Sequence, residues 1–251
     1  GELAARVNML YASLLSTIEN LEEEKRKVRE AEQSKIDFLR AASHELKTPV
    51  TALNAILENM ILGVGKYKDR DSCLLECKEI TGQLSFMIKE ILDTSRLDFT
   101  QEEKDAENFD LSESLPALCE PYQLIATAKK IGFSLSIQEK CLVYTSKKSL
   151  EKILSNLLSN AVSYTKPGHK ISVVLTAQQI KIENECTPIP PEKLAHVFEP
   201  FYRPDFARNR KDGGNGLGLY IVDRLSKALR LSYQFEATEN PPGMCFTLFL
   251  S

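Results

Sequence analysis

Apolar residues in the first hundred positions recur at alternating spacings of three and four, a pattern typical of a helix with one apolar stripe. The clearest run comprises Leu39, Ala42, Leu46, Pro49, Leu53, Ile56 and Met60. The same register continues upstream through Val28, Leu21, Ile18, Leu14, Tyr11 and Val7. Because Lys25, Glu32 and Lys35 also fall on this register, we expect the upstream part to be a poorly packed coil. Such a coil is either a signal-transmitting rod or a frayed linker.

A second helix is expected after a hinge at Gly63–Gly65. Its apolar period is carried by Leu74, Cys77, Ile80, Leu84, Met87 and Ile91. A hairpin of two helices with a single apolar stripe cannot bury that stripe alone, whereas two hairpins paired into a four-helix bundle can. The pattern therefore predicts a homodimer.

The chain changes character near residue 100. Residues 100–108 (TQEEKDAEN) are polar and acidic and are expected to form a linker. Beyond it we expect helices at 111–129, 146–164 and 216–229, and strands at Phe133–Gln138, Ile171–Thr176, Ile180–Glu183, Leu231–Ala237 and Met244–Leu250. Consecutive strands at the end, with helices elsewhere, indicate a mixed sheet with helices on one face, an α+β layer.

Composition adds three constraints. The 251 residues suffice for two domains of ordinary size, and the net charge of −3 argues against a dedicated nucleic-acid binder. The six cysteines form no CxxC pair, and this is typical of reduced cytosolic thiols. Even Cys73 and Cys77, which lie one helical turn apart, are better explained as buried thiols than as half of a metal site.

No apolar run approaches the ~18–20 residues that span a bilayer. Because the chain starts at Gly1 without Met, we expect a cytoplasmic piece of a longer protein, with any membrane anchor in the missing N-terminal part.

His44 lies mid-helix in the run SHELKTP. A lone helical histidine is ordinarily a satisfied side chain, but three neighbours change that expectation. Glu45 can accept the Nδ1 proton and leave Nε2 as a nucleophile, and Thr48 places a hydroxyl one turn on, on the same face. Pro49 has no backbone N–H and its ring crowds the carbonyl of Glu45, so we expect it to interrupt and bend the helix. A bend there is a natural hinge for admitting another domain.

The run FLRAASHELKTP resembles the phosphoacceptor box of the HisKA family of sensor histidine kinases. The resemblance implies that His44 is the phosphoacceptor and Glu45 its acid/base partner. It also implies that Thr48 orients water when such kinases dephosphorylate their partner response regulator. The opening run GELAARVNMLYASLLSTIENL is similar to the last helix of a HAMP signal relay.

A second group of motifs lies in the α+β part. LEKILSNLLSNAVSYT carries Asn156 and Asn160 on one helix face, where an amide oxygen can ligate Mg²⁺ that bridges ATP phosphates, although either residue alone fits a polar position on an amphipathic helix. GGNGLGLYIV places Gly214, Gly216 and Gly218 before an apolar helix, where backbone N–H groups can approach phosphates. A lone glycine cluster is more often a loop. The ordered series of asparagine helix, strand, FEPFYR, basic loop, glycine turn and helix is a much stronger signal.

That series resembles the ATP-binding domain shared by histidine kinases, gyrase, the heat-shock chaperone ATPases and MutL. The resemblance implies an α/β sandwich that binds ATP with Mg²⁺, with Asn160 as the metal ligand and a lid at 203–213. Basic lid residues would be available to the γ-phosphate, although a solvated charge run is the alternative. The implied ATP-binding set is Asn156, Asn160, Tyr164, Asn184, Phe198, Phe201, Arg203, Arg208, Arg210, Lys211, Gly214, Gly216, Leu217 and Gly218.

With both resemblances, the chain divides into three implied domains. Residues 1–34 would be a HAMP-like or coiled-coil signalling helix, and 35–100 a dimerisation and histidine phosphotransfer hairpin. Residues 101–251 would be the catalytic ATP-binding domain.

Several positions differ from patterns known in this superfamily. Hydrolases of this superfamily place a water-activating Glu four residues before the metal Asn, where this chain has Asn156, a poor base, so phosphotransfer is favoured over hydrolysis. The adenine-contacting Asp aligns with Asn184, and two glycines align with Cys186 and Pro188. Asn184 retains an acceptor oxygen for the adenine N6 amine and an amide that can donate to a ring nitrogen, so we expect ATP binding to survive. A further family Asp is replaced by Ser146, a good helix N-cap.

Three functions compete. The first is a two-component kinase that autophosphorylates His44, passes the phosphate to an aspartate of a response regulator and dephosphorylates that regulator. The second is an ATP-sensing pseudokinase scaffold, motivated by the missing glycines around Cys186. The third, an ATPase of the gyrase or chaperone kind, is disfavoured by Asn156 and the hairpin. The regulator could dock on an apolar strip formed by Leu53, Ile56, Leu57 and Met87. Burial of the same four side chains in the core of the bundle is an alternative that explains them at least as well.

The lid and glycine turn, FYRPDFARNRKDGGNGLGLYIV, together with Asn184, resemble the VanS-type kinases of glycopeptide-resistant Gram-positive bacteria. The resemblance implies a membrane receptor that responds to vancomycin-class antibiotics, with a VanR-like regulator as its partner.

Overall fold

The computed structural model describes residues 1–95, 105–204 and 214–250. The chain divides into two compact units, Gly1–Ile80 and Thr81–Ser251. All six cysteines are free thiols, as the sequence predicted. None of the helices that the structure describes combines the length and hydrophobicity needed to traverse a bilayer.

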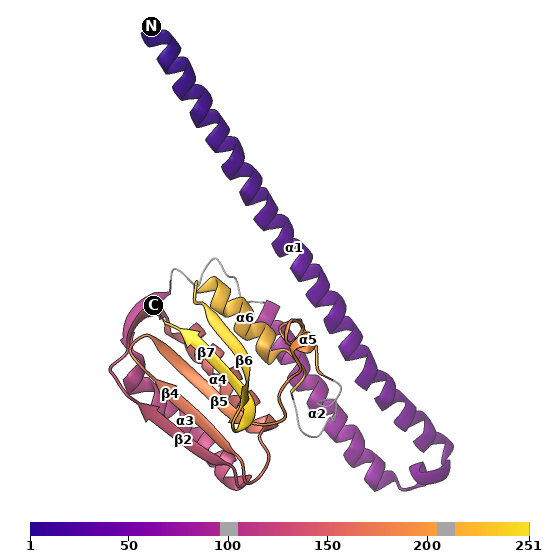
Figure 1. Cartoon of the computed structure of the whole chain (residues 1–251). Helices are drawn as coiled ribbons and strands as arrows, with labels where there is room; N and C mark the ends of the chain where they lie inside the picture. The colour runs from indigo at the N-terminus through magenta and orange to yellow at the C-terminus, as the bar shows by residue number, and fades with distance from the viewer. Residues whose placement is uncertain (96–104, 205–213, 251) are drawn as a thin grey trace. The chain divides into compact units, whose positions relative to one another are not determined.

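The first unit is built on one long helix, α1 (Glu2–Leu62), drawn in indigo in Figure 1. The predicted interruption at Pro49 is wrong, because the helix continues through this residue. One proline removes a single backbone hydrogen bond, and the rest of a helix this long can hold the conformation. The helix ends at Gly63, whose φ of 64° is left-handed. The N–H of Val64 then donates to the carbonyl of Asn59 at 3.3 Å, which closes the helix end as a Schellman turn.

The predicted hinge at Gly63–Gly65 is thus confirmed as the end of α1. A short 3₁₀ helix, η1 (Gly65–Lys68), leads into α2 (Arg70–Ser95). The side chain of Asp69 accepts a hydrogen bond from the backbone N–H of Ser72 at 3.2 Å and so caps α2.

A small apolar cluster holds the closed end of this hairpin together. Ile56 from α1 packs with Cys73 and Cys77 from α2, and all three side chains are buried. Partly buried residues surround them: Leu53, Met60, Tyr67 and Ile80. The two cysteines are therefore buried apolar side chains, as predicted. Upstream, the apolar register of α1 lies exposed at Val7, Tyr11, Leu14, Ile18, Leu21 and Val28.

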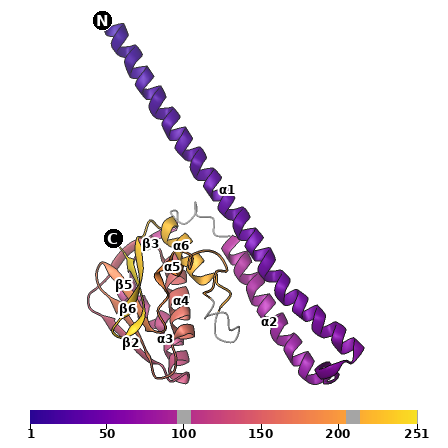
Figure 2. The ribbon, with the colours of Figure 1, turned by 45° about the vertical axis from the view of Figure 1, so that its right-hand side comes forward.

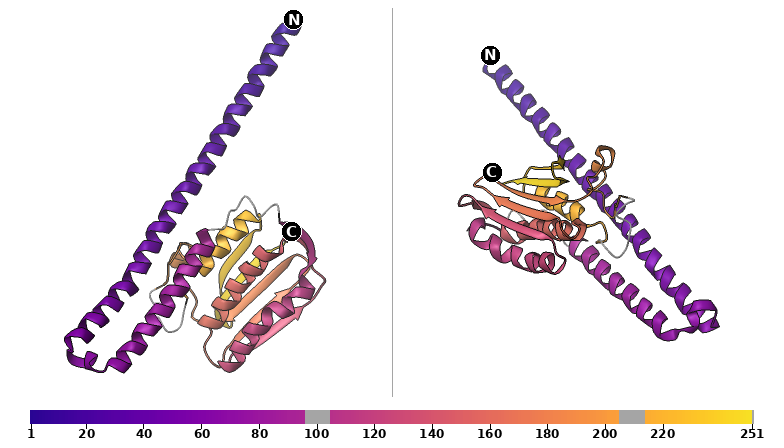
Figure 3. Two further views of the ribbon diagram at one scale, coloured as in Figure 1. Left: turned by 180° about the vertical axis from the view of Figure 1, so that it is seen from behind. Right: turned by 60° about the horizontal axis from the view of Figure 1, so that its bottom comes forward.

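The second unit contains a two-layer α/β sandwich. Its elements in chain order are β1 (Ala106–Asp110), α3 (Leu111–Ala128), β2 (Gly132–Ile137), β3 (Leu142–Ser146), α4 (Lys147–Tyr164), β4 (Lys170–Leu175), β5 (Gln179–Glu185), α5 (Pro191–Leu194), α6 (Gly218–Ala228), β6 (Tyr233–Glu239) and β7 (Pro242–Phe249). Five strands form one sheet in the order β2-β4-β5-β7-β6, in which only β2 and β4 are parallel neighbours. Helices α3, α4 and α6 cover one face of this sheet (Figures 2 and 3).

The core lies between these helices and the sheet. Fully buried side chains come from α3, α4, β4, β5 and α6: Leu111, Leu115, Leu150, Ile153, Leu154, Leu158, Ile171, Leu175, Ile180, Ile221 and Leu225. Helix α4 begins where the Ser146 side chain accepts a hydrogen bond from the N–H of Ser149 at 3.4 Å, so the predicted N-cap is confirmed. Asp110 caps α3 in the same way.

Two strands were not predicted. β1 and β3 pair only with each other, in a small antiparallel sheet apart from the main one. β1 (AENFD) carries little apolar character and overlaps the end of the expected linker at 100–108. Its strand conformation follows from pairing with β3, a tertiary contact that no local pattern encodes. The strands and helices that were predicted in this part of the chain are confirmed, with shifts of at most two residues at their ends.

Candidate functional site

The predicted phosphoacceptor turn lies on the solvent-facing side of α1. His44, Glu45 and Thr48 are all exposed, whereas Pro49 on the opposite side is buried. The hydroxyl of Thr48 donates to the backbone carbonyl of His44 at 3.5 Å, which places the two residues one above the other. The turn thus presents an imidazole and a hydroxyl together to solvent.

The expected hydrogen bond between Glu45 and the His44 ring is not formed in this structure. Neither side chain has a hydrogen-bond partner among the described residues. Adjacent residues on a helix point about 100° apart, so Glu45 can reach the ring only after a rotamer change or a change in the helix.

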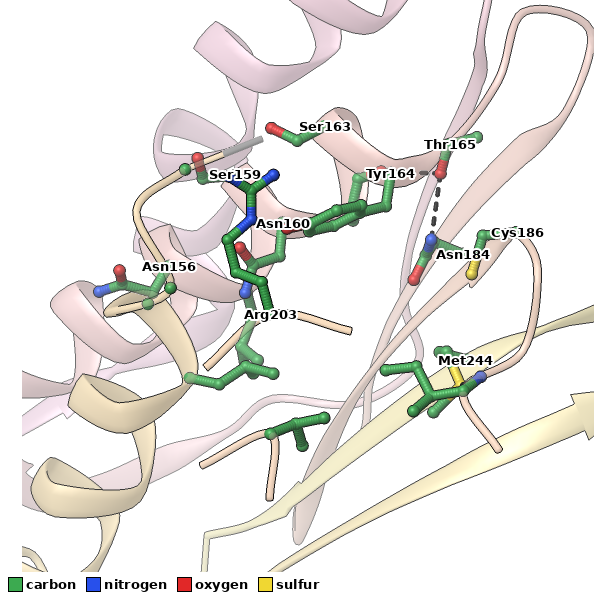
Figure 4. A pocket seen from close by; sticks show the side chains of 18 of the residues that line it. Asn156, Ser159, Asn160, Ser163, Tyr164, Thr165, Asn184, Cys186, Arg203 and Met244 are labelled. Atoms are coloured by element: carbon green, nitrogen blue, oxygen red, sulfur yellow. Dashed lines mark hydrogen bonds between the residues drawn. The ribbon is translucent and has the colours of Figure 1, made fainter. Parts of the chain in front are cut away.

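A cavity in the second unit collects most of the predicted nucleotide-binding residues. Side chains or backbone of eight of them line it: Asn156, Asn160, Tyr164, Asn184, Arg203, Gly214, Gly216 and Gly218. They come from α4, from the end of β5, from the segment that follows α5 and from the turn and first residue of α6 (Figure 4). Four segments of the chain therefore form one site.

The two asparagines of α4 face the start of α6. The amide nitrogen of Asn156 donates to the carbonyl of Lys152 at 2.8 Å, so its carbonyl oxygen is the atom left for other contacts. A Cβ atom placed on Gly218 would lie 3.3 Å from Oδ1 of Asn156 and 3.4 Å from both side-chain atoms of Asn160. The N-terminus of α6 is therefore packed directly against the asparagine pair.

The glycine turn is held by its backbone. Gly216 has a φ of 80°, and its carbonyl accepts a hydrogen bond from the N–H of Phe201 at 3.0 Å. The side chain of Asn215 accepts from the N–H of Leu217 at 3.3 Å and also lines the cavity. Asn215 was not among the predicted site residues, although an asparagine just before a helix is a recognisable capping signal.

A hydrogen-bonded chain lies at the end of β5. The amide nitrogen of Asn184 donates to Oγ1 of Thr165 at 3.2 Å (Figure 4), and Oγ1 of Thr165 donates to the carbonyl of Ala161 at 2.7 Å. Thr165 lines the cavity and was not predicted, because no local pattern relates it to a strand residue further along the chain.

Cys186 and Pro188 stand where the family pattern has glycines. Cys186 lines the cavity, and its backbone N–H donates to the carbonyl of Pro242 at 3.2 Å. Burial raises the pKa of the Cys186 thiol, while a hydrogen bond from the Asn184 side chain opposes that rise. At neutral pH this thiol is therefore protonated, and it behaves as a small, weakly polar side chain on the cavity wall.

Three predicted residues do not line the cavity. Phe198 packs against Tyr233 and Phe235, with ring centroids 5.2 and 6.0 Å apart, and Phe201 and Leu217 are buried beneath the turn. They support the site from behind. The remaining predicted lid residues, Arg208, Arg210 and Lys211, lie outside the described residues.

The described residues contain no group of three or more His, Cys, Asp or Glu side chains that could hold a metal by themselves. The cavity offers amide oxygens instead, from Asn156 and Asn160. Such neutral ligands suit Mg²⁺ when phosphate oxygens and water supply most of its coordination sphere. The donor set is thus compatible with a metal that arrives with a nucleotide.

Two family profiles match this chain. Residues 34–100 match the His Kinase A (phospho-acceptor) domain. Residues 145–251 match the histidine kinase-, DNA gyrase B- and HSP90-like ATPase domain. The first match contains the exposed turn of His44, and the second contains the lined cavity.

The chain is also similar to curated sensor proteins. The chain is 34% identical over 254 residues to the sensor protein VanSB of Enterococcus faecalis, covering 100% of this chain and 56% of that protein. It is 31% identical over 250 residues to the sensor histidine protein kinase HK06 of Streptococcus pneumoniae, covering 100% of this chain and 55% of that protein. The chain thus spans about half the length of these curated relatives.

A solved structure agrees with the fold. The histidine kinase AdeS of Acinetobacter baumannii superposes with a TM-score of 0.61 at 26% identity, covering 83% of this chain and 97% of that one. The histidine kinase ThkA, solved in complex with its response regulator protein TrrA, has a TM-score of 0.61 at 19% identity and covers 91% of this chain and 66% of that one. The latter likeness concerns the fold alone.

Proposed function

This chain belongs to the sensor histidine kinase family, and we propose that it phosphorylates His44 from ATP bound in the cavity between α4 and α6. The observation that carries the proposal is the packing of Asn156 and Asn160 against the N-terminus of α6. Amide oxygens for a phosphate-bound metal and a helix N-terminus, whose positive dipole end attracts phosphate, thereby lie in one site.

The transfer is a displacement at phosphorus. Nε2 of His44 attacks the γ-phosphorus of ATP, the bond from that phosphorus to the β–γ bridging oxygen breaks, and ADP leaves. The imidazole loses its Nδ1 proton, for which the neighbouring Glu45 is the nearest carboxylate in sequence. A carboxylate of a response regulator then attacks the phosphohistidine, the N–P bond breaks, and an aspartyl phosphate forms.

Each part of the cavity has a proposed role in binding ATP. Asn160 ligates Mg²⁺, the ring of Tyr164 lies against the base or ribose, and Arg203 with the basic lid residues meets the phosphates. Gly214, Gly216 and Gly218 keep the backbone accessible to the phosphates. Asn156 stands where a hydrolase needs a base, and a carboxamide cannot take a proton from water at neutral pH. We therefore assign the site to phosphotransfer and not to ATP hydrolysis.

We assign three domains in keeping with these roles: a HAMP-like signalling helix at 1–34, a dimerisation and phosphotransfer hairpin at 35–100, and a catalytic domain at 101–251. The HAMP-like sequence supports a location on the cytoplasmic side of a membrane receptor. Exposed apolar side chains on the hairpin support a homodimer in which a second copy covers them: Leu57, Leu74, Leu75 and Leu92.

A finer proposal concerns the signal. Full-length similarity of this chain to part of VanSB, at 34% identity, supports a role in glycopeptide-resistance signalling with a VanR-like response regulator. Transfer from the phosphorylated chain to a panel of purified regulators tests this. We expect the VanR-type regulator to accept the phosphoryl group at least tenfold faster than the others, and equal rates across the panel would contradict the assignment.

Incubation of the full chain with Mg²⁺ and γ-labelled ATP tests the central proposal. We expect a protein-bound phosphate that is stable in base and labile in acid, and that is absent from His44→Gln. His169→Gln is a matched control, because His169 is also exposed but does not line the cavity. Label that persists in His44→Gln would overturn the assignment of the acceptor.

The same assay separates a second candidate function. Cys186 and Pro188 replace two glycines of the family pattern, and this favours a regulator-binding scaffold that senses ATP without using it. Such a protein binds Mg-ATP and the regulator but acquires no label. Steady release of phosphate without labelled protein would indicate an ATPase instead.

A further inference from the structure

Asn184 and Thr165 form a hydrogen-bonded pair on the wall of the cavity. Oγ1 of Thr165 lies 2.7 Å from the carbonyl oxygen of Ala161 and 3.2 Å from the amide nitrogen of Asn184. Thr165 is buried, with only 5% of its surface exposed. The pair links the end of β5 to the last turn of α4.

The two distances decide which way each hydrogen bond runs. A separation of 2.7 Å is typical of O–H···O, and one near 3 Å is typical of N–H···O. The hydroxyl has one proton, and the short contact assigns that proton to the carbonyl of Ala161. Oγ1 can then only accept from Asn184, so the carboxamide must present its NH₂ group to Thr165.

This arrangement fixes the direction of the other end of the carboxamide. With the nitrogen held by Thr165, Oδ1 is the group turned away from that residue, and in Figure 4 it points into the cavity. The Asn184 side chain also forms a hydrogen bond with the Cys186 thiol, and this bond lowers the pKa of the thiol, as expected of a donor. Thr165 and Cys186 therefore both lie on the NH₂ side of the amide. The cavity therefore receives an acceptor and no donor from Asn184.

An aspartate at this position would need no second residue to fix its orientation, because both of its oxygens accept hydrogen bonds. A carboxamide can present either an acceptor or a donor, and a rotation of 180° exchanges the two. Once a family aspartate is replaced by Asn184, a second residue has to set its orientation.

We propose that Thr165 is a positioning residue that holds the carboxamide of Asn184 with Oδ1 toward the cavity. The site thereby selects purine nucleotides with a 6-amino group over those with a 6-oxo group. The inference rests on the proposed nucleotide-binding function and deepens it. A 6-amino group donates to Oδ1, whereas a 6-oxo group would place two acceptors against each other.

Mg-ADP and Mg-IDP are the probes, because their bases differ only in the 6-amino or 6-oxo group and the protonation of N1 that follows from it. Calorimetric titration of the full chain should give tighter binding of ADP than of IDP. In Thr165→Val, which removes the hydroxyl and keeps the branched shape, the amide can turn to suit either base. We expect the ratio of the two dissociation constants to fall roughly tenfold, the size of one well-placed base contact.

A double-mutant cycle isolates positioning from a general structural effect. In an Asn184→Asp background the side chain has no orientation to set, so adding Thr165→Val should leave the ADP/IDP ratio unchanged. Thr165→Ser should keep the wild-type ratio, since it retains the hydroxyl. Thr127→Val is the matched control, because Thr127 makes the same kind of bond to a helix carbonyl, to Gln123 at 2.8 Å, away from the cavity.

The possible failures are distinguishable. If the wild-type chain binds neither nucleotide, the proposed function fails, and this inference fails with it. If it prefers ADP but Thr165→Val weakens both nucleotides equally, or shifts the ratio to the same extent in the Asn184→Asp background, only the positioning role is overturned.

Discussion

Gly216 and Phe201 touch through their backbones: the N–H of Phe201 donates to the carbonyl of Gly216 at 3.0 Å, and a Cβ atom on Gly216 would lie 2.7 Å from the carbonyl carbon of Phe201. The φ of 80° at Gly216 is itself unfavourable for any residue with a side chain. The turn that leads into α6 is therefore held against the backbone of Phe201 by a close approach that only glycine permits.

Gly216→Ala should for this reason damage both stability and nucleotide binding. Left-handed backbone strain and the clash together should lower the free energy of unfolding by about 1–3 kcal/mol. Urea denaturation measures this change, and titration with Mg-ADP should show at least a tenfold loss of affinity. Gly214→Ala is the control for stability, since a Cβ at Gly214 meets nothing within 4 Å. Equal destabilisation by both substitutions would contradict the steric argument.

Asn160→Ala should remove the effect of Mg²⁺ on nucleotide binding. If Asn160 is the protein ligand of a metal that also binds the phosphates, the wild-type chain binds ADP more tightly with Mg²⁺ than with EDTA, by about tenfold or more. In the variant the two dissociation constants should converge. A variant that keeps the full Mg²⁺ effect would show that the ion is held elsewhere.

Much of this site follows from the sequence because its residues belong to regular elements. The helical period of α4 places Asn156 and Asn160 on one face, and the glycine turn precedes an apolar helix as its pattern predicts. The contact between the two segments, through Gly218, is a tertiary contact, and no local pattern contains it. The resemblance to a known domain supplied that juxtaposition.

The parts that were not predicted depend on pairing between distant segments. Strands β1 and β3 pair with each other across a long stretch of sequence, and Thr165 acquires its role from a residue on another element. Pro49 led to the opposite error, because the missing N–H and the crowded carbonyl were expected to interrupt a helix that in fact continues for 61 residues. Local propensity predicts elements well, but it does not predict which of them meet.

Thr48→Ala should separate the two activities proposed for the phosphoacceptor turn. The hydroxyl of Thr48 lies over the carbonyl of His44 and is exposed, so its loss should leave helix and imidazole in place. We expect the rate of His44 labelling to stay within twofold of wild type. The release of phosphate from a phosphorylated regulator should be at least tenfold slower, because the variant lacks the group proposed to position water. Thr51→Ala is the control, since Thr51 makes a similar bond to the carbonyl of Lys47. Equal loss of both activities would indicate a structural role.

Stability of the second unit should depend on Asp110 in acid. A hydrogen bond from the Ser112 hydroxyl, and then the Lys140 ammonium, hold the pKa of this carboxyl below its ordinary value of 3.8. Because the folded-state pKa is the lower one, the carboxylate stabilises the fold fully above about pH 4, and this contribution is lost as the pH falls through the folded-state pKa. Asp110→Asn retains the N-cap but cannot titrate, so its urea midpoint should fall less steeply between pH 5 and pH 2. Identical slopes for the two proteins would contradict this assignment.

Cys186 should be the first thiol of the folded chain to react, and bound nucleotide should protect it. It is partly exposed and lines the cavity, whereas the other five cysteines are buried. Alkylation proceeds through the thiolate, and burial raises the pKa of Cys186 above 9.0, so the rate at neutral pH should be low and should rise about tenfold per pH unit toward that pKa.

Mass spectrometry after treatment with iodoacetamide identifies the modified residue. Saturating Mg-ADP should slow labelling of Cys186 at least tenfold, because the base occupies the wall on which the thiol lies beside Asn184. Cys186→Ala should remove the fast phase and leave the slow reaction of the buried thiols unchanged. Labelling of Cys186 that is indifferent to Mg-ADP would place the nucleotide away from the end of β5, and the adenine side of the site would then have to be sought elsewhere in the cavity.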